Sequence, residues 1–310
     1  NLHIKLKTLI KKILRLITIF IGVTFLSFVL IHYSNIDPAE AYARRNYVRV
    51  TNSQIEEIRK KFGYDKPMAE QYFKYIKRLL KGDMGISFRT NNPVFKDIKN
   101  TLPSTLILVL TSAIWIALFS ICFGTLSALK KNTLLDIIIG FITMIGISLP
   151  TFWLGYILLL YFAVKFPLFK VVDYGTVKSL ILPSLTFAIP IASSFIRIIR
   201  GDLIKELNTD YIIYAKARGI KGFTLLWYVL VNILPPIISL FFQNLGFMLG
   251  GSAIIESVFS WPGFGSYFIS SILEKDLPAI SGCLIVITVL FIFFNNLALL
   301  LNKKLNPRII

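Results

Sequence analysis

Residue types that carry catalysis or bind metals are scarce in this chain. Its histidines are His3 and His32, and its cysteines are Cys122 and Cys283, both inside apolar runs. Two histidines are too few for a metal cage, and the cysteines are best explained as small buried apolar side chains. The sequence contains no Walker A pattern, H-E-x-x-H motif or nucleophile elbow. It therefore predicts no catalytic residue, no metal site and no cofactor bound by this chain.

The composition is that of a membrane protein. Of 310 residues, 55% are hydrophobic and 16% are charged, whereas soluble domains carry about 25% charged residues. The charged residues lie between long apolar runs, as expected for a chain that crosses a bilayer. The net charge is +18. Because the basic residues flank apolar segments, we assign them to membrane topology and anionic headgroups rather than to nucleic acid.

Six apolar segments have the ~20 residues that a helix needs to cross the hydrocarbon core. They cover 13–31, 104–128, 135–164, 180–199, 229–253 and 280–302. The third is long enough to require tilt or an interfacial extension, and prolines in the fourth and fifth predict kinks. The first could also be a signal peptide, but its apolar run exceeds the ~7–15 residues of a signal-peptide core, which favours a retained helix.

The distribution of lysine and arginine predicts the orientation. Basic residues cluster before the first segment, after the second, between the fourth and fifth, and after the sixth. Such an excess marks the cytoplasmic side of a membrane. Both termini and the connection 200–228 are therefore expected in the cytoplasm and 32–101 outside, since loops longer than ~60 residues do not count in this rule.

The long outer loop is expected to fold. Ser53-Gln54-Ile55-Glu56 matches a capping box for a helix that runs to Phe62 and ends at Gly63. A second amphipathic helix is predicted from Met68 to Leu80. We interpret its aromatic residues as packing the loop onto the membrane domain rather than as a ligand site.

The polar residues well inside the apolar segments are uncharged hydroxyl and amide side chains, and no Asp or Glu lies in the middle of a segment. Ion-coupled carriers usually need ionisable residues at that depth. Hydroxyl and amide side chains can line an aqueous path or join helices. Candidates for path lining are Ser148, Thr151, Gln243 and Asn244. Active transport by this chain would therefore draw its energy from a partner.

The connection 200–228 is too polar to span and predicts two short helices. The first would present Leu203, Ile204 and Leu207 on one face. The second would be capped by one residue of 208–210 and end at Gly219. Ala215 and Ala217 are small, which would let another protein approach the backbone closely. A docking knob and an interfacial helix pair that only links two spans are both compatible with this pattern.

A second unusual segment is the predicted outer turn at 256–265. Pro262, Gly263 and Gly265 allow a tight re-entrant turn. Glu256, Phe259 and Trp261 would then face a binding protein or the mouth of a path. The alternative is a rigid packed loop with Trp261 as an interfacial anchor.

Several motifs resemble one family of transporters. Asp210-Tyr211-(x)3-Ala215-Lys216-Ala217-Arg218-Gly219 resembles the "EAA" loop of binding-protein-dependent ABC importer permeases. The rest of the chain narrows the resemblance to the dipeptide/oligopeptide/nickel permease family, first-subunit type, over essentially its whole length. One departure is Tyr228, where many members have His. Further matching segments are Gly82–Ser87, Leu102–Leu106, Ser148–Gly155, Leu182–Thr186, Glu256–Gly265 and Asn306–Arg308.

The resemblance implies a fold and a set of partners. The fold is all-α, a type I ABC importer permease with six transmembrane helices in a bacterial cytoplasmic membrane. Its parts would be 1–31, an extracytoplasmic loop domain 32–101, a five-helix core 102–302 and a tail 303–310. Implied partners are a second homologous permease, two cytoplasmic ATP-binding subunits that use the ATP, and an extracytoplasmic solute-binding protein. The coupling residues would be Asp210, Tyr211, Ala215, Lys216, Ala217 and Gly219.

The leading hypothesis is thus a permease subunit for peptides or a related solute such as a nickel chelate. A secondary carrier that works alone is the main alternative, and transport down an ion gradient without ATPases would favour it. An export or assembly scaffold without a solute path is a third, favoured by the absence of solute-dependent ATPase stimulation. The substrate within the family is not predicted.

Overall fold

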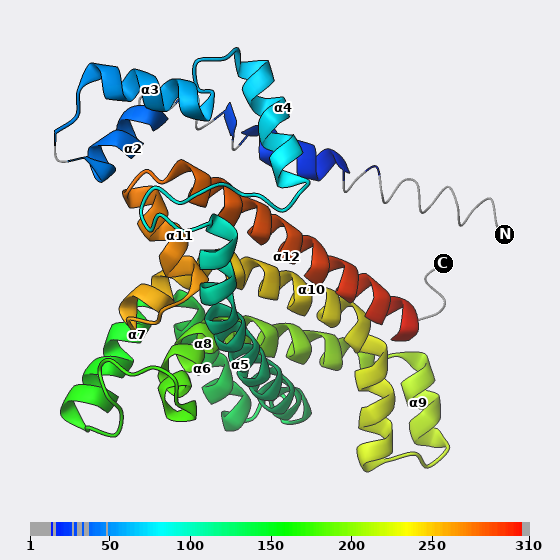
Figure 1. Cartoon of the computed structure of the whole chain (residues 1–310). Helices are drawn as coiled ribbons and strands as arrows, with labels where there is room; N and C mark the ends of the chain where they lie inside the picture. The colour runs from blue at the N-terminus through cyan, green and yellow to red at the C-terminus, as the bar shows by residue number, and fades with distance from the viewer. Residues whose placement is uncertain are drawn as a thin grey trace. The chain divides into compact units, whose positions relative to one another are not determined.

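The computed structural model describes residues 14, 17–26, 28–29, 33, 37–47 and 49–305. Within these residues the chain is helical and forms no strand beyond an isolated bridge between Ile86 and Pro93. The helices are labelled in Figure 1. Their bounds are α2 Pro38–Asn46, α3 Asn52–Phe62, α4 Met68–Leu79, α5 Val94–Leu129, α6 Leu134–Ser148, α7 Thr151–Leu159, the π-helix η1 Leu160–Lys165, α8 Val177–Glu206, α9 Asp210–Ala217, α10 Gly222–Val258, α11 Phe264–Leu273 and α12 Leu277–Leu305.

The chain divides into two compact units. The first comprises Asn1–Leu102 and Tyr267–Leu290, and the second comprises Pro103–Ser266 and Phe291–Ile310. The predicted parts 32–101 and 102–302 differ from this division, because residues 267–290 belong to the first unit. A division of the sequence into contiguous segments could not reveal that residues 267–290 pack with the N-terminal part of the chain.

The first unit contains the helices that the outer-loop pattern predicts. The helices α3 and α4 lie where they are expected, and Gly63 ends α3 in the left-handed region at φ +76°. The predicted cap at Ser53 is wrong, because Thr51 is the N-cap and forms the capping box with Gln54. The Thr51 hydroxyl accepts from the third amide of the helix, and the Gln54 side chain accepts from the Thr51 amide.

The second unit is a bundle in which α8 contacts α6, α7 and α10. Gly155 on α7 shows how closely they pack. A Cβ at this position would lie 3.1 Å from Val258 Cγ1 on α10 and 3.3 Å from Thr186 Cγ2 on α8. A side chain here would require these neighbours to move by a few tenths of an ångström, so glycine favours the close approach of the short helix α7 to the two long helices.

Four of the described helices are long and apolar enough to cross a bilayer. They are Val94–Leu129, Val177–Glu206, Gly222–Val258 and Leu277–Lys304. Each contains one predicted span, which confirms a helix of sufficient length and hydropathy at 104–128, 180–199, 229–253 and 280–302. The prolines of the fourth and fifth predicted spans lie inside α8 and α10. The first predicted span, 13–31, falls partly outside the described residues, within which Ile17–Leu26 is a short apolar helix.

The prediction of one continuous segment over 135–164 needs correction. The chain bends by 105° between Leu134–Ser148 and Thr151–Lys165. Leu149, which precedes Pro150, adopts an extended conformation with φ −80° and ψ 127°. The proline ring disfavours helical geometry at the residue before it, so the helix stops there. The break divides the long apolar segment into two shorter helices.

Candidate functional site

The candidate coupling element is the helix α9 between the end of α8 and the start of α10. The α8 helix runs on to Glu206, so the first predicted short helix is the last turns of α8. Leu203 there and Ile212 on α9 are fully buried. By contrast, Ile213 and Tyr214 are 53% and 70% exposed. One buried residue thus anchors α9, while most of its surface is open.

Local hydrogen bonds set the start of α9. Of the three predicted capping residues, Thr209 occupies the N-cap position, but its side chain does not cap the helix. Its hydroxyl donates instead to the Glu206 carbonyl, at 2.6 Å. The Asn208 amide donates to the Ile204 carbonyl, at 2.8 Å. Both side chains therefore complete the end of α8, which fixes where the chain turns.

The C-terminus of α9 is closed by Gly219. Its φ of +83° confirms the predicted left-handed residue. The Ile220 amide donates to the Ala215 carbonyl, at 3.1 Å, and the Gly219 amide donates to the Lys216 carbonyl, at 3.0 Å. This pair of bonds is a Schellman motif, which satisfies the last carbonyls of the helix.

Tyr211 joins the three helices of the element. Its hydroxyl donates to Glu206 at the end of α8 and accepts from Asn232 Nδ2 on α10, the latter at 2.8 Å. Burial and the Glu206 carboxylate raise the pKa of Tyr211, so the hydroxyl stays protonated and can donate. Asn232 also donates to the carbonyl of Tyr228, at 3.1 Å, whose side chain is exposed.

The remaining coupling candidates are accessible. Asp210, Lys216, Ala217 and Gly219 are exposed and Ala215 is half-buried. On the first turns of α10, Phe223 is 77% exposed and stacks on the exposed Trp227 at 6.5 Å between ring centroids. Exposed small residues of α9 and exposed large apolar side chains of α10 therefore lie on two helices that contact each other. Exposed apolar clusters of this kind mark interaction sites.

The predicted outer turn lies between α10 and α11 and is packed. Glu256 is fully buried and Trp261 is 3% exposed. Glu256 accepts from the Thr105 hydroxyl at 2.5 Å and from the Ser266 amide at 2.7 Å. Trp261 Nε1 donates to the Ser104 carbonyl at 3.1 Å. This geometry fits the packed-loop alternative, since neither side chain faces outward in this chain.

Pro262 and Gly263 complete the turn. A Cβ on Gly263 would overlap the Glu256 carboxyl group, so glycine is what lets the chain pass over the buried acid. The Gly263 amide donates to the Ser266 hydroxyl, at 3.2 Å, as α11 begins. The turn is therefore fixed from both sides by polar contacts.

The path-lining candidates form two separate pairs. Ser148 and Thr151 flank the break between α6 and α7, whereas Gln243 and Asn244 lie in the middle of α10. Ser148 donates to Met144 and Asn244 to Leu240, each within its own helix. The contact of α7 with α10 at Val258 lies roughly 20 Å along the helix from Gln243. The structure does not bring the two pairs together.

Sequence reasoning missed an ion pair between α6 and α8. Arg200 donates to both carboxylate oxygens of Asp136 at 2.7 Å. Asp136 also accepts from the Ser127 hydroxyl and from the Asn132 amide. A lone acid at the start of an apolar segment carries no sequence signal for a partner 64 positions away. Within the described ranges, no three His, Cys, Asp or Glu side chains meet as a metal site requires.

Comparison with known proteins assigns the chain to a family. Residues 120–310 match the model for "Binding-protein-dependent transport system inner membrane component", and residues 5–110 match the N-terminal model of the same systems. The metal-staphylopine import system permease protein CntB of Staphylococcus aureus is 33% identical over 98% of both chains. The oligopeptide transport system permease protein AppB of Bacillus subtilis is 33% identical over 97% of this chain and 98% of its own.

A third relative is the glutathione transport system permease protein GsiC of Escherichia coli. It is 32% identical over 98% of this chain and 99% of its own. Each of these names describes the permease protein of a transport or import system, and the names differ in the solute that they state. The chain therefore belongs to the family of binding-protein-dependent transport system inner membrane components, the permease subunits of ABC importers.

Proposed function

We propose that this chain forms half of the translocation path of an ATP-driven importer and is coupled to its ATPases through α9. The other half would be a second homologous permease, with two cytoplasmic ATP-binding subunits below and a solute-binding protein outside. The family and its relatives support these partners. This chain would bind no cofactor, and the ATP would be hydrolysed by the partner subunits.

The observation that supports the coupling role is that α9 is largely exposed, while one of its residues, Ile212, is buried against the rest of the chain. Ile212 is fully buried, while Ala217 and Tyr214 face out. Two states of a transporter can be coupled only through contacts that differ between them. A short helix fixed by Ile212 and closed by Gly219 can pass a displacement to α8 and α10 without unfolding.

The topology follows from the charges. Six transmembrane helices, with 13–31 as the first, would place both termini and 200–228 in the cytoplasm and the loop domain 32–101 outside, as in a type I importer permease. Labelling of single cysteines in intact cells with an impermeant reagent tests this. Asn91→Cys should react and Lys221→Cys should not, and labelling of Lys221→Cys would refute the orientation.

We propose a peptide or a peptide-like chelate as the solute. The relatives' names state oligopeptide, glutathione and metal-staphylopine as their solutes. The chain has two histidines, which favours transport of a metal as an intact chelate over direct coordination. Ser148, Thr151, Gln243 and Asn244 remain the proposed path residues. Glu256, Trp261, Pro262 and Gly263 form the outer turn, for which we propose a packed, supporting role.

The direct test is reconstitution of the chain with its partner subunits in liposomes. We expect uptake of a peptide delivered by the binding protein to require ATP and both ATP-binding subunits. A cysteine at Lys216 should crosslink to an ATP-binding subunit, whereas a cysteine at Lys170, which lies outside α9, should not. Uptake by this chain alone under an ion gradient would instead establish a secondary carrier.

A further inference from the structure

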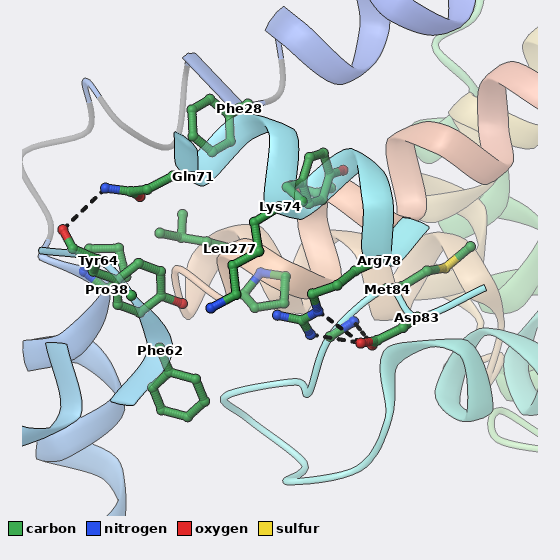
Figure 2. Close-up of a pocket in the computed structure, with 15 residues that line it drawn as sticks. Phe28, Pro38, Phe62, Tyr64, Gln71, Lys74, Arg78, Asp83, Met84 and Leu277 are labelled. Atoms are coloured by element: carbon green, nitrogen blue, oxygen red, sulfur yellow. Dashed lines mark hydrogen bonds and ion pairs between the residues drawn. The ribbon is translucent and has the colours of Figure 1, made fainter. Parts of the chain in front are cut away.

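The first unit contains a pocket between α4 and the first turns of α12. One face of α4 lines it with Gln71, Lys74, Tyr75 and Arg78, opposite Leu277, Pro278 and Ser281. Figure 2 shows Lys74 and Arg78 extending from α4 into this space. The cavity volume is about 120 Å³, several times the ~10–15 Å³ that one water requires on this measure. The pocket can therefore hold more than isolated waters.

The wall of the pocket is largely apolar and aromatic. Its contributing side chains are Phe28, Pro38, Phe62, Tyr64, Met84 and Leu277. Ligand pockets typically combine such walls with a few polar groups that fix orientation. The apolar part of a ligand would be buried against these rings.

Two buried hydroxyls of the pocket lie next to each other. Ser281 is 2% exposed, and its hydroxyl and that of Tyr75 interact with each other but have no other hydrogen-bond partner among the described residues. Burial raises the pKa of Tyr75 to about 12, and the hydrogen bond with the Ser281 hydroxyl opposes this rise. Both hydroxyls can therefore donate at neutral pH. Buried hydroxyls are usually fully hydrogen-bonded, and this pair retains unused donor and acceptor capacity that faces the pocket.

The charges of the pocket leave one cation unbalanced. Arg78 donates to Asp83 at 2.8 Å and 3.3 Å, so these two neutralise each other. The amide of Gln71 donates to the carbonyls of Tyr64 and Lys66. Lys74 makes no ion pair with any described residue. Its ammonium group, together with the Tyr75 and Ser281 hydroxyls, suits a compact anion.

The location of the pocket indicates the source of that anion. Leu277 and Pro278 open the apolar helix Leu277–Lys304, one of the helices long enough to cross a bilayer. The end of such a helix lies at the level of the lipid headgroups. Basic pockets between transmembrane helices bind anionic headgroups on the cytoplasmic side, and the same charge and hydrogen-bond chemistry applies to an anionic lipid of the outer leaflet. A lipid would also supply glycerol and acyl groups for the aromatic wall.

We propose that this pocket binds the phosphate of an anionic phospholipid, held by Lys74, Tyr75 and Ser281. The site is independent of the proposed transport function, since it uses none of the coupling or path residues. A free phosphate shares the chemistry of the headgroup but has no part to occupy the apolar wall.

The test is native mass spectrometry of the assembled transporter released from nanodiscs that contain phosphatidylglycerol and phosphatidylcholine. The full-length chain should retain phosphatidylglycerol in preference to phosphatidylcholine. Lys74→Gln should weaken retention about tenfold, the typical loss for one charge-assisted hydrogen bond. Tyr75→Phe should weaken it several-fold. Lys77→Gln is the matched control, because Lys77 is on the same helix but does not line the pocket.

Each outcome decides the proposal. Selective loss in Lys74→Gln, with Lys77→Gln unchanged and equal thermal stability of the two variants, supports it. Equal retention by the two variants would overturn it. Competition with inorganic phosphate and with a short-chain soluble phosphatidylglycerol separates the two sources. Displacement by inorganic phosphate as effective as by the soluble lipid would assign the pocket to a free anion and reject the lipid.

Discussion

The Arg200 guanidinium donates to both oxygens of Asp136, from Nε and Nη2, at 2.7 Å each. Asp136 lies in the first turn of α6, and Arg200 lies near the end of α8, the helix that leads into α9. The Asp136 side chain is 7% exposed and that of Arg200 is 34% exposed. The ion pair therefore joins the start of α6 to the end of α8, next to the proposed coupling helix α9.

Removing the arginine should destabilise the second unit. Arg200→Leu leaves the Asp136 carboxylate buried without its cation, which costs ~3–5 kcal/mol for a fully buried pair. Because Arg200 is partly exposed, we expect about 2 kcal/mol, measured as a lower midpoint of thermal unfolding of the assembled complex. Arg197→Leu, one turn away and exposed, is the control and should have little effect. A double variant that also carries Asp136→Asn should recover part of the loss.

Two glycine substitutions should have opposite effects. Gly219→Ala places a side chain at φ +83°, where no neighbour would clash but the backbone is strained by ~1–2 kcal/mol. Gly201→Ala lies inside α8 with open space around it and should stabilise by ~0.5–1 kcal/mol. Thermal unfolding of both variants checks the sign. Equal shifts would contradict the left-handed closure of α9.

The ends of two helices, α3 and α9, were predictable from the sequence, whereas other features were not. Gly63 and Gly219 each follow an amphipathic or capped run, and glycine is the residue that ends a helix at positive φ at little cost. The cap at Thr51 rather than Ser53 was missed because both sequences satisfy a capping pattern, and only the backbone decides between them. Pro150 could have indicated the break at Leu149, but the apolar residues on both sides of it led to the prediction of one continuous segment.

Contacts between distant residues were beyond the reach of pattern reasoning. Two such contacts join different helices. Asp136 and Arg200 are 64 positions apart in the sequence, and Thr105 and Glu256 are 151 positions apart. Hydrophobic periodicity gives the existence of each helix but not the facing residue. The turn at Glu256 therefore offered two interpretations from sequence, and the buried hydrogen bonds are what favour packing.

Variants of Trp261 separate packing from gating. Trp261→Phe loses the bond to the Ser104 carbonyl, worth about 1 kcal/mol, and Trp261→Ala also leaves a cavity that costs ~3–5 kcal/mol. For a packed turn, uptake per assembled complex should be unchanged in both, while the amount of complex falls more in Trp261→Ala. Full assembly of Trp261→Phe with loss of uptake would show a direct role in the path.

The hydrogen bonds of Tyr211 should support coupling. Tyr211→Phe removes the donor to Glu206 and the acceptor of Asn232 while keeping the ring. We expect a loss of about 1 kcal/mol in stability and fewer solute molecules carried per ATP hydrolysed. Tyr214→Phe is the matched control, because the Tyr214 side chain is exposed. An equal coupling ratio in the two variants would mean that Tyr211 only packs.

The most direct test of the central claim is the ratio of solute uptake to ATP hydrolysis in the reconstituted transporter with Ala217→Trp. Ala217 is exposed on α9, so a bulky side chain there leaves this chain's own packing intact and acts only on a docked partner. The account predicts normal assembly in the membrane and retained ATP hydrolysis, with uptake reduced at least about tenfold, the effect of ~1.4 kcal/mol. Ala217→Ser, which keeps the residue small, should transport normally. Full uptake by Ala217→Trp at an unchanged ratio would contradict coupling through α9.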